Sequence, residues 1–222
     1  AGNVATSVAG TTGGLFTIAA DGSYTFDPDG DFEGLAVGES DTTSVDYTIS
    51  DGEGGTDTAT LTITVNGVND APATTPITNQ TNFDADAPTL DVSGNFSDVD
   101  GDTLTYSASG LPAGLTINST TGVISGTIVK SASDATNDDD NTQVYNVTVT
   151  ADDGTTSTNS AFTWTVDNTI PVAADDVNST DEDTTLTVAA AIDGVIDPND
   201  TDLDGDTLNV TSYTNGLATG NA

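Results

Sequence analysis

The chain has 222 residues, a single basic side chain against 36 Asp and Glu, no His and no Cys, which gives a formal net charge of -35. This charge excludes nucleic acid and anionic membranes as partners, because both bind through clustered Lys and Arg. No apolar run approaches the roughly 20 residues of a transmembrane helix, so membrane insertion is not expected, and the lack of Cys excludes disulfides and thiolate metal sites.

The acidic excess is almost entirely aspartate, since the glutamates are only Glu33, Glu39, Glu53 and Glu182. Asp has a short side chain suited to tight loops and to the oxygen coordination of hard cations. Bound divalent cations would relieve the self-repulsion of so large a charge. The alternative, that the acidity only keeps a secreted protein soluble, stays open.

The first predicted elements are two hairpins. The turn Ala20-Asp21-Gly22-Ser23 signals one, and Asp51-Gly52-Glu53-Gly54-Gly55 signals another, whose strands run from Tyr47 to Val65. In the second strand of that hairpin, period-two alternation places four apolar residues on one face and threonines on the other: Ala59, Leu61, Ile63 and Val65.

Two later runs alternate in the same way. Tyr145, Val147 and Val149 are predicted to point inward from one strand, and Phe162, Trp164 and Val166 share a face of the next. No stretch shows a helical period with caps. Short strands, regular turns and one-sided alternation predict an all-β fold of tandem sandwich modules.

Two prolines divide the chain, in Val68-Asn69-Asp70-Ala71-Pro72 and in Val166-Asp167-Asn168-Thr169-Ile170-Pro171. We expect residues 71–170 to form one complete module, residues 1–70 the C-terminal part of another, and residues 171–222 the N-terminal part of a third. Residues 171–222 followed by 1–70 would make a full module. The chain is thus expected to be one period of a longer array, with each partial module completed by a neighbouring copy, along one polypeptide or by strand exchange.

The strongest chemical motif is Asp98-Val99-Asp100-Gly101-Asp102-Thr103-Leu104, echoed by Asp202-Leu203-Asp204-Gly205-Asp206-Thr207-Leu208. Alternate aspartates around a glycine can turn two or three carboxylates toward one point, and Ca²⁺ accepts six to eight such oxygens. Each loop leads into a strand, so neither is an EF-hand. A solvated turn is the alternative, and Mg²⁺ suits so many carboxylates less well.

Other clusters are weaker candidates. Asp27-Pro28-Asp29-Gly30-Asp31 has suitable spacing, but a plain turn explains it equally well. The run Asn137-Asp138-Asp139-Asp140-Asn141 is read as a solvated loop tip. Lys130 could form a Lys-Asn cross-link only if it were buried beside an Asn and an acid, and an isolated surface lysine is the favoured interpretation.

Two sets of motifs resemble bacterial repeat families. Gly22-Ser23-Tyr24-Thr25-Phe26-Asp27-Pro28, with Tyr47-Thr48-Ile49-Ser50-Asp51-Gly52, is similar to the VCBS-type and cadherin-like repeats of giant secreted adhesins. Gly110-Leu111-Pro112-Ala113-Gly114-Leu115-Thr116-Ile117, with Thr121-Gly122-Val123-Ile124-Ser125-Gly126-Thr127, resembles dystroglycan-type cadherin-like and immunoglobulin-like repeats. The resemblance implies secretion to the bacterial cell surface, calcium in and between modules, and roles in adhesion or biofilm.

The resemblance also implies which side chains meet at each junction between modules. The first junction would use Asn69, Asp70, Asp98 and Asp100, with Asp51 as a further candidate and an equivalent of Glu182 from the preceding copy. The second would use the following residues: Asp167, Asn168, Asp202, Asp204, Asp206, Asp86 and one of Asp152 and Asp153.

The sequence therefore predicts a non-enzymatic, calcium-stiffened structural repeat of an extracellular bacterial adhesin or surface filament. An enzyme is not expected, because there is no His, no Cys and no nucleophile motif, and Trp164 alternates with core positions. The expected partners are neighbouring copies of the same repeat, with cell-surface or matrix ligands as further candidates. The alternative function is a ligand-binding adhesin module that takes a carbohydrate or a protein.

Overall fold

The computed structural model describes residues 5–133, 142–188, 199–203, 207–210 and 213. Over these residues the chain consists of β-strands and loops, and its one helical element is the short 3-10 turn η1 (Ser93–Asn95). The all-β fold predicted from the period-two alternation is confirmed. No helix in this part of the chain has the length and apolar character needed to cross a membrane.

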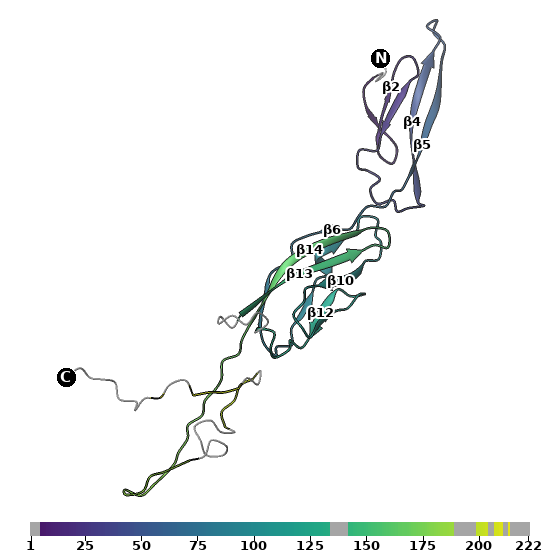
Figure 1. Ribbon diagram of the computed structural model, residues 1–222. Helices are drawn as coiled ribbons and strands as arrows, with labels where there is room; N and C mark the ends of the chain where they lie inside the picture. Colours follow the sequence, from purple (N-terminus) through teal and green to yellow (C-terminus); the bar gives the residue numbers. More distant parts are fainter. Residues whose placement is uncertain (1–4, 134–141, 189–198, 204–206, 211–212, 214–222) are drawn as a thin grey trace, which may run out of the picture.

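Two β-sheet units follow one another end to end (Figure 1). The first unit contains two small antiparallel sheets. One has the strand order β1-β2-β3 and the other pairs β4 with β5. The bounds are β1 (Val8–Ala9), β2 (Leu15–Ile18), β3 (Tyr24–Asp27), β4 (Ser40–Ser50) and β5 (Thr56–Asn66).

Both predicted hairpins of the first unit are present. The turn between β2 and β3 holds Asp21, whose Oδ1 accepts a hydrogen bond from the Ser23 N–H at 3.0 Å. The turn between β4 and β5 holds Asp51, whose Oδ1 accepts hydrogen bonds from the N–H groups of Glu53 at 2.8 Å and Gly55 at 2.9 Å. These bonds satisfy turn donors that lie outside the strand ladder.

The core of the first unit is small. Phe16 is buried, and its ring centroid lies 4.9 Å from that of Phe26. Leu61 and Ile63 are half-buried on one face of β5, as predicted, whereas Ala59 near the start of the strand is exposed. The two sheets enclose an open cleft of about 770 Å³ between β2, β3 and the C-terminal half of β4.

The second unit has the two facing sheets of a β-sandwich. A four-stranded sheet in the order β10-β13-β14-β7 lies against a three-stranded sheet in the order β11-β12-β8, and β6 pairs with β9. β7 runs parallel to β14, and every other pairing in the unit is antiparallel over the described residues. The bounds are β6 (Ala73–Thr74), β7 (Gln80–Phe83), β8 (Thr89–Asp91), β9 (Phe96–Ser97), β10 (Thr105–Ser109), β11 (Leu115–Ile117), β12 (Val123–Gly126), β13 (Thr142–Asp152) and β14 (Ser157–Asp167).

The core of the second unit includes the residues of β13 and β14 that the alternation predicted, together with residues of other segments such as Phe96 and Tyr106. Val147 and Val149 of β13 are fully buried, as are Trp164 and Val166 of β14. They pack against Ile124 of β12 in the opposite sheet. The predicted inward faces of β13 and β14 are therefore confirmed, and burial of apolar side chains from both sheets stabilises this unit.

Two polar contacts anchor the loops around this core. The Trp164 indole Nε1–H donates a hydrogen bond to Asn82 Oδ1 at 3.1 Å, which satisfies the one polar atom of the buried ring. Asp84 is fully buried, and its Oδ1 accepts hydrogen bonds from the backbone N–H groups of Ala132 at 2.9 Å and Ser133 at 3.2 Å. Asp84 therefore holds the segment after β12 against the end of β7.

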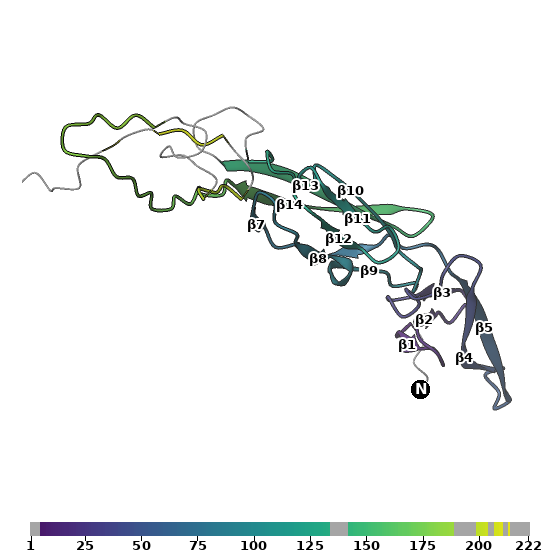
Figure 2. The same ribbon diagram turned by 90° about the horizontal axis from the view of Figure 1, so that it is seen from below.

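The residues after Asp167 leave the second unit at the end that lies away from the first unit (Figures 1 and 2). The described residues between 170 and 213 contain no strand, and one β-bridge joins Val172 to Thr201. Large apolar side chains in this segment are exposed, among them Val177 and Tyr213.

We expect Asp84→Ala to lower the free energy of unfolding of the second unit by about 2 kcal/mol or more, because two buried N–H groups lose their acceptor at about 1–3 kcal/mol each. Asp84→Asn keeps Oδ1 as an acceptor and should cost less. Urea unfolding followed by the fluorescence of Trp164, the single tryptophan of the chain, measures both variants. Equal losses in the two variants would contradict this role for Asp84.

Candidate metal centre

The loop between β9 and β10 gathers three carboxylates at one point. Asp98, Asp100 and Asp102 each place an oxygen within 4.8 Å of an oxygen of the other two. Gly101 has a φ of 78°, a left-handed conformation that costs glycine little and lets the loop reverse between the second and third aspartate. The Asp102 N–H donates to Asp98 Oδ1 at 3.2 Å and closes the turn.

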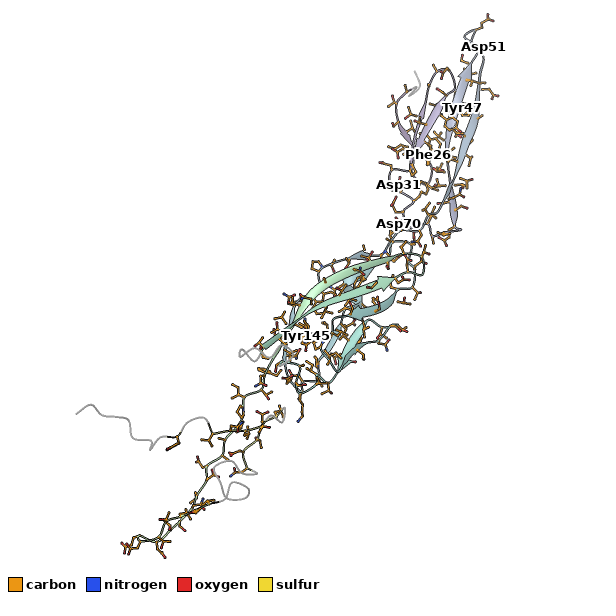
Figure 3. All side chains as sticks on the ribbon, in the orientation of Figure 1. Phe26, Asp31, Tyr47, Asp51, Asp70 and Tyr145 are labelled. Atoms are coloured by element: carbon orange, nitrogen blue, oxygen red, sulfur yellow. The ribbon has the colours of Figure 1, made fainter. Side chains whose placement is uncertain are left out.

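The linker between the two units lies against this loop. The Asp70 backbone N–H donates a hydrogen bond to Asp100 Oδ2 at 2.8 Å. The Asn69 side-chain amide donates to Asp153 Oδ2 at 3.0 Å, and Asp153 lies in the turn between β13 and β14. The linker, the β9–β10 loop and the β13–β14 turn therefore meet at the seam between the units (Figure 3).

Two carboxylate oxygens at this seam are buried without a hydrogen-bond donor. Asp98 uses Oδ1 to accept from the Asp102 N–H, and Asp100 uses Oδ2 to accept from Asp70, so the backbone fixes both carboxylates. Their remaining oxygens, Asp98 Oδ2 and Asp100 Oδ1, are buried and have no partner. Buried acceptors are normally satisfied, and a bound cation would satisfy both of these oxygens.

The electrostatics of the seam separate two kinds of aspartate. Partial burial, followed by the charges of Asp98 and Asp100, raises the pKa of Asp102 above its ordinary value of 3.8. Hydrogen bonds from the backbone N–H of Thr156 and from the Asn69 amide hold the pKa of Asp153 well below that value. The Asp102 carboxylate is thus surrounded by like charge, whereas Asp153 is already stabilised by donors.

Sequence reasoning did not identify Glu39 as part of this site. Glu39 belongs to the turn before β4 in the first unit, and its charge contributes to the raised pKa of Asp102. No motif marks it, since it is a single glutamate outside any aspartate-rich loop. Only the end-to-end arrangement of the two units brings its charge near the β9–β10 loop.

The structure corrects the expected position of three aspartates. Asp152 and Asp153 were expected at the second junction, but they end β13 and begin its turn, at the first junction beside Asn69. Asp51 was expected at the first junction and lies instead at the far tip of the β4–β5 hairpin (Figure 3). Each of these turns joins two strands of 11 residues. The turn therefore lies at one end of its unit, and the linker that follows the second strand lies at the other end.

The remaining predicted ligands lie around or beyond the other end of the second unit. Asp167 ends β14, and its Oδ1 accepts a hydrogen bond from the Thr142 hydroxyl at 2.9 Å, with the half-buried Asn168 next in the chain. Asp86 Oδ2 accepts from the Asn82 amide at 3.0 Å. Glu182 is exposed and Asp202 is half-buried beside the bridge residue Thr201, while Asp204 and Asp206 lie outside the described residues.

The weaker candidates take part in ordinary contacts. Asp27 Oδ1 accepts from the Asp29 N–H at 3.1 Å, and Asp31 Oδ2 accepts from the Gly14 N–H at 2.8 Å, so both carboxylates support turns. Lys130 is exposed, which does not favour the buried environment that a Lys-Asn cross-link needs. The run at residues 137–141 lies outside the described residues.

Comparison with known proteins gives two family matches. Residues 1–67 match the family described as "Bacterial cadherin-like domain", and residues 71–167 match the family described as "Putative Ig domain". Both families describe non-enzymatic modules. No curated protein matches the chain.

Several solved structures are similar to parts of the chain. Mouse cadherin-23 EC22–24 is 13% identical, with a TM-score of 0.47, over 77% of this chain and 56% of that one. Human protocadherin-24 EC1–2 is 18% identical, with a TM-score of 0.34, over 46% and 45%. An endo-fucoidan hydrolase of glycoside hydrolase family 107 is 23% identical, with a TM-score of 0.34, over 74% of this chain and 23% of that one.

The family matches fall on the stretches whose motifs suggested them. The cadherin-like match covers the unit with the β2–β3 and β4–β5 hairpins, and the Ig match covers the closed sandwich that follows. The resemblance drawn from the sequence motifs is confirmed: residues 1–67 are similar to bacterial cadherin-like domains and residues 71–167 to immunoglobulin-like domains, which supports an adhesion-type structural repeat.

Proposed function

We propose that the chain is a calcium-stiffened structural repeat of an extracellular bacterial adhesin or surface filament, which acts as an extender in adhesion or biofilm. One observation carries this proposal: Asp98 and Asp100 each have one oxygen fixed by a backbone N–H and one buried oxygen without a donor. Asp102 adds a third carboxylate within 4.8 Å. Three converging carboxylates, two of which have a buried oxygen without a donor, suit a cation better than a solvated turn.

Calcium fits this donor set better than magnesium. Ca²⁺ takes six to eight oxygen ligands in flexible geometry, whereas Mg²⁺ demands octahedral geometry and keeps several waters. The seam offers carboxylates from Asp98, Asp100 and Asp102, and the linker residue Asp70 lies beside them through its N–H bond to Asp100. No nitrogen or sulfur ligand competes, since the chain lacks His and Cys.

The position of the site explains how a cation would stiffen the chain. The carboxylates belong to the second unit, Asp70 belongs to the linker, and Glu39 of the first unit contributes to the local negative charge. Without a cation these like charges repel one another. A bound Ca²⁺ would replace that repulsion by attraction and fix the angle between the units.

The extracellular assignment rests on the family match of residues 1–67 to a bacterial cadherin-like domain. Extracellular calcium modules have dissociation constants of about 10⁻⁴ to 10⁻³ M, so millimolar calcium outside the cell would fill the site. The same proposal divides the chain into modules at residues 70/71 and 170/171, with the early part of a module beginning at residue 171. Neighbouring copies of the repeat are then the primary partners.

We expect Asp100→Asn to weaken calcium binding at the seam by about tenfold or more, because it removes a carboxylate charge from the ligand set. Asp57→Asn is the matched control, since it removes the same charge from an exposed position on β5. Isothermal titration of both variants measures the difference. The same calcium affinity in the two variants would contradict the site.

Calcium affinity should fall as the pH is lowered toward the raised pKa of Asp102, above the ordinary value of 3.8. A raised pKa means that the folded chain binds the Asp102 carboxyl proton more tightly than the unfolded chain does. Protonation therefore stabilises the calcium-free fold at low pH, and this stabilisation is lost as the pH rises through the pKa of Asp102. Calcium needs the ionised form and therefore gains affinity over the same range. Titrations at several pH values test this, and an affinity that stays constant down to about pH 4 would contradict it.

Removal of calcium should shorten the particle and broaden its distribution of dimensions in small-angle scattering, because the seam between the units becomes a hinge. Asp100→Asn in calcium should behave like the wild type in chelator, whereas Asp57→Asn should behave like the wild type in calcium. Identical scattering with and without calcium, at a concentration where the chain is monomeric, would contradict the stiffening role.

A further inference from the structure

The Asp153 carboxylate in the β13–β14 turn differs from the carboxylates of the β9–β10 loop, because hydrogen-bond donors occupy both of its oxygens. Oδ1 accepts from the backbone N–H groups of Thr155 and Thr156, each at 2.7 Å. Oδ2 accepts from the Thr156 hydroxyl at 2.9 Å and from the Asn69 amide at 3.0 Å. A carboxylate with donors on both oxygens does not need a cation to be satisfied.

Asn69 connects the linker to this turn. Its side-chain Nδ2 donates to Asp153 Oδ2, and it also lies 3.3 Å from Thr156 Oγ1 as a second acceptor in the turn. The same nitrogen donates to the backbone oxygen of Asp70 at 3.0 Å. Asn69 is half-buried, and its bond to an ionised acceptor is of the stronger, charge-assisted kind.

The next linker residue makes a second attachment to the second unit. Asp70 lies where the two units meet (Figure 3), and its backbone N–H donates to Asp100 Oδ2 at 2.8 Å. This bond fixes one oxygen of Asp100 and leaves Oδ1 as the buried oxygen without a donor. The orientation of the Asp100 carboxylate therefore depends on where the linker holds the Asp70 N–H.

The first unit holds the chain only as far as Gly67. The Gly67 N–H donates to the backbone oxygen of Glu39 at 3.0 Å. A Cβ at this position would collide with the backbone oxygens of Leu35 and Ala36, so the Gly67 backbone packs directly on that loop. Val68 lies between the attachments to the two units and is 75% exposed.

We propose that Asn69 and Asp153 form a linker clamp, which fixes the linker to the second unit without a cation and leaves Val68 as the hinge between the units. Asp153 is then a positioning residue and not a ligand of the cation. It holds the Asn69 amide, and the linker held in this way keeps the Asp70 N–H on the Asp100 carboxylate. The effect of the clamp on calcium binding rests on the proposed function, whereas the clamp itself consists of hydrogen bonds within the chain.

Hydrogen exchange in chelator, measured for single residues by NMR, tests the clamp without calcium. The Asp70 amide of the wild type should stay protected, because Asp100 still accepts its hydrogen bond. Asn69→Ala should speed the exchange of this amide about tenfold, which corresponds to the loss of one hydrogen bond. Asn146→Ala is the matched control, since Asn146 is an exposed asparagine on β13, and it should leave the rate unchanged.

Two results of this experiment would overturn the clamp. One is an Asp70 amide that loses its protection in the wild type when calcium is removed. The other is an Asp70 exchange rate that Asn69→Ala leaves unchanged.

Exchanging the two side chains tests whether the pair itself forms the clamp. Asp153→Asn puts an amide donor in place of the acceptor, and Asn69→Asp places two carboxylates together, so each single variant should speed exchange of the Asp70 amide. The double variant Asn69→Asp/Asp153→Asn restores one donor and one acceptor at unchanged net charge. Its exchange rate should return close to that of the wild type. A double variant that exchanges as fast as the single variants would overturn the assignment to this pair.

Calcium titration separates a positioning residue from a ligand. Asn69→Ala and Asp153→Asn break the same hydrogen bond and should weaken calcium binding by similar factors, each smaller than the loss of about tenfold or more expected for Asp100→Asn. A loss in Asp153→Asn as large as in Asp100→Asn, with wild-type affinity in Asn69→Ala, would make Asp153 a ligand and overturn its positioning role. A wild type that binds no calcium would contradict the proposed function alone, because the exchange rates in chelator decide the clamp independently.

Discussion

Repulsion among carboxylates at the seam between the two units is the constraint on which the rest of the structure depends. Asp98, Asp100 and Asp102 converge within one loop. The linker contributes a hydrogen bond from the Asp70 backbone N–H to Asp100, and no basic side chain. The chain has a net charge of -35 and a single basic side chain, the exposed Lys130, so salt bridges could offset at most one of these charges. In the proposed function, a divalent cation would bind these carboxylates, replace their mutual repulsion by attraction and connect the two units.

The two units illustrate what a closed sandwich needs. In the second unit, strands from both halves of the module bury Trp164 and Val149 completely. In the described residues of the first unit, the corresponding hairpin of β4 and β5 borders an open cleft, and Phe16 is the buried residue of its core. In the proposed function, calcium at the seam would set the angle between the two units. The sandwich fold alone specifies none of this.

Period-two alternation was sufficient to predict β13 and β14 and their inward residues, because burial on one face of a sheet imposes that pattern on residues such as Val147 and Phe162. The shorter strands β6 to β12 carry too few residues to show it. The aspartate loop at residue 98 was also identifiable, since its spacing is local. The sequence did not reveal which end of a unit each turn occupies, because strand length and direction determine it. Asp51 and Asp153 were therefore assigned to the wrong ends of their units. Glu39 carries no local signal, and only packing of the two units brings its charge near Asp102.

A crystal structure of the chain grown in millimolar calcium tests the central claim most directly. The account predicts an ion at the seam, with Asp98 Oδ2 and Asp100 Oδ1 as ligands at about 2.3–2.6 Å and an oxygen of Asp102 in the same shell. Water molecules or donor groups on these two oxygens, with no ion present at saturating calcium, would contradict it.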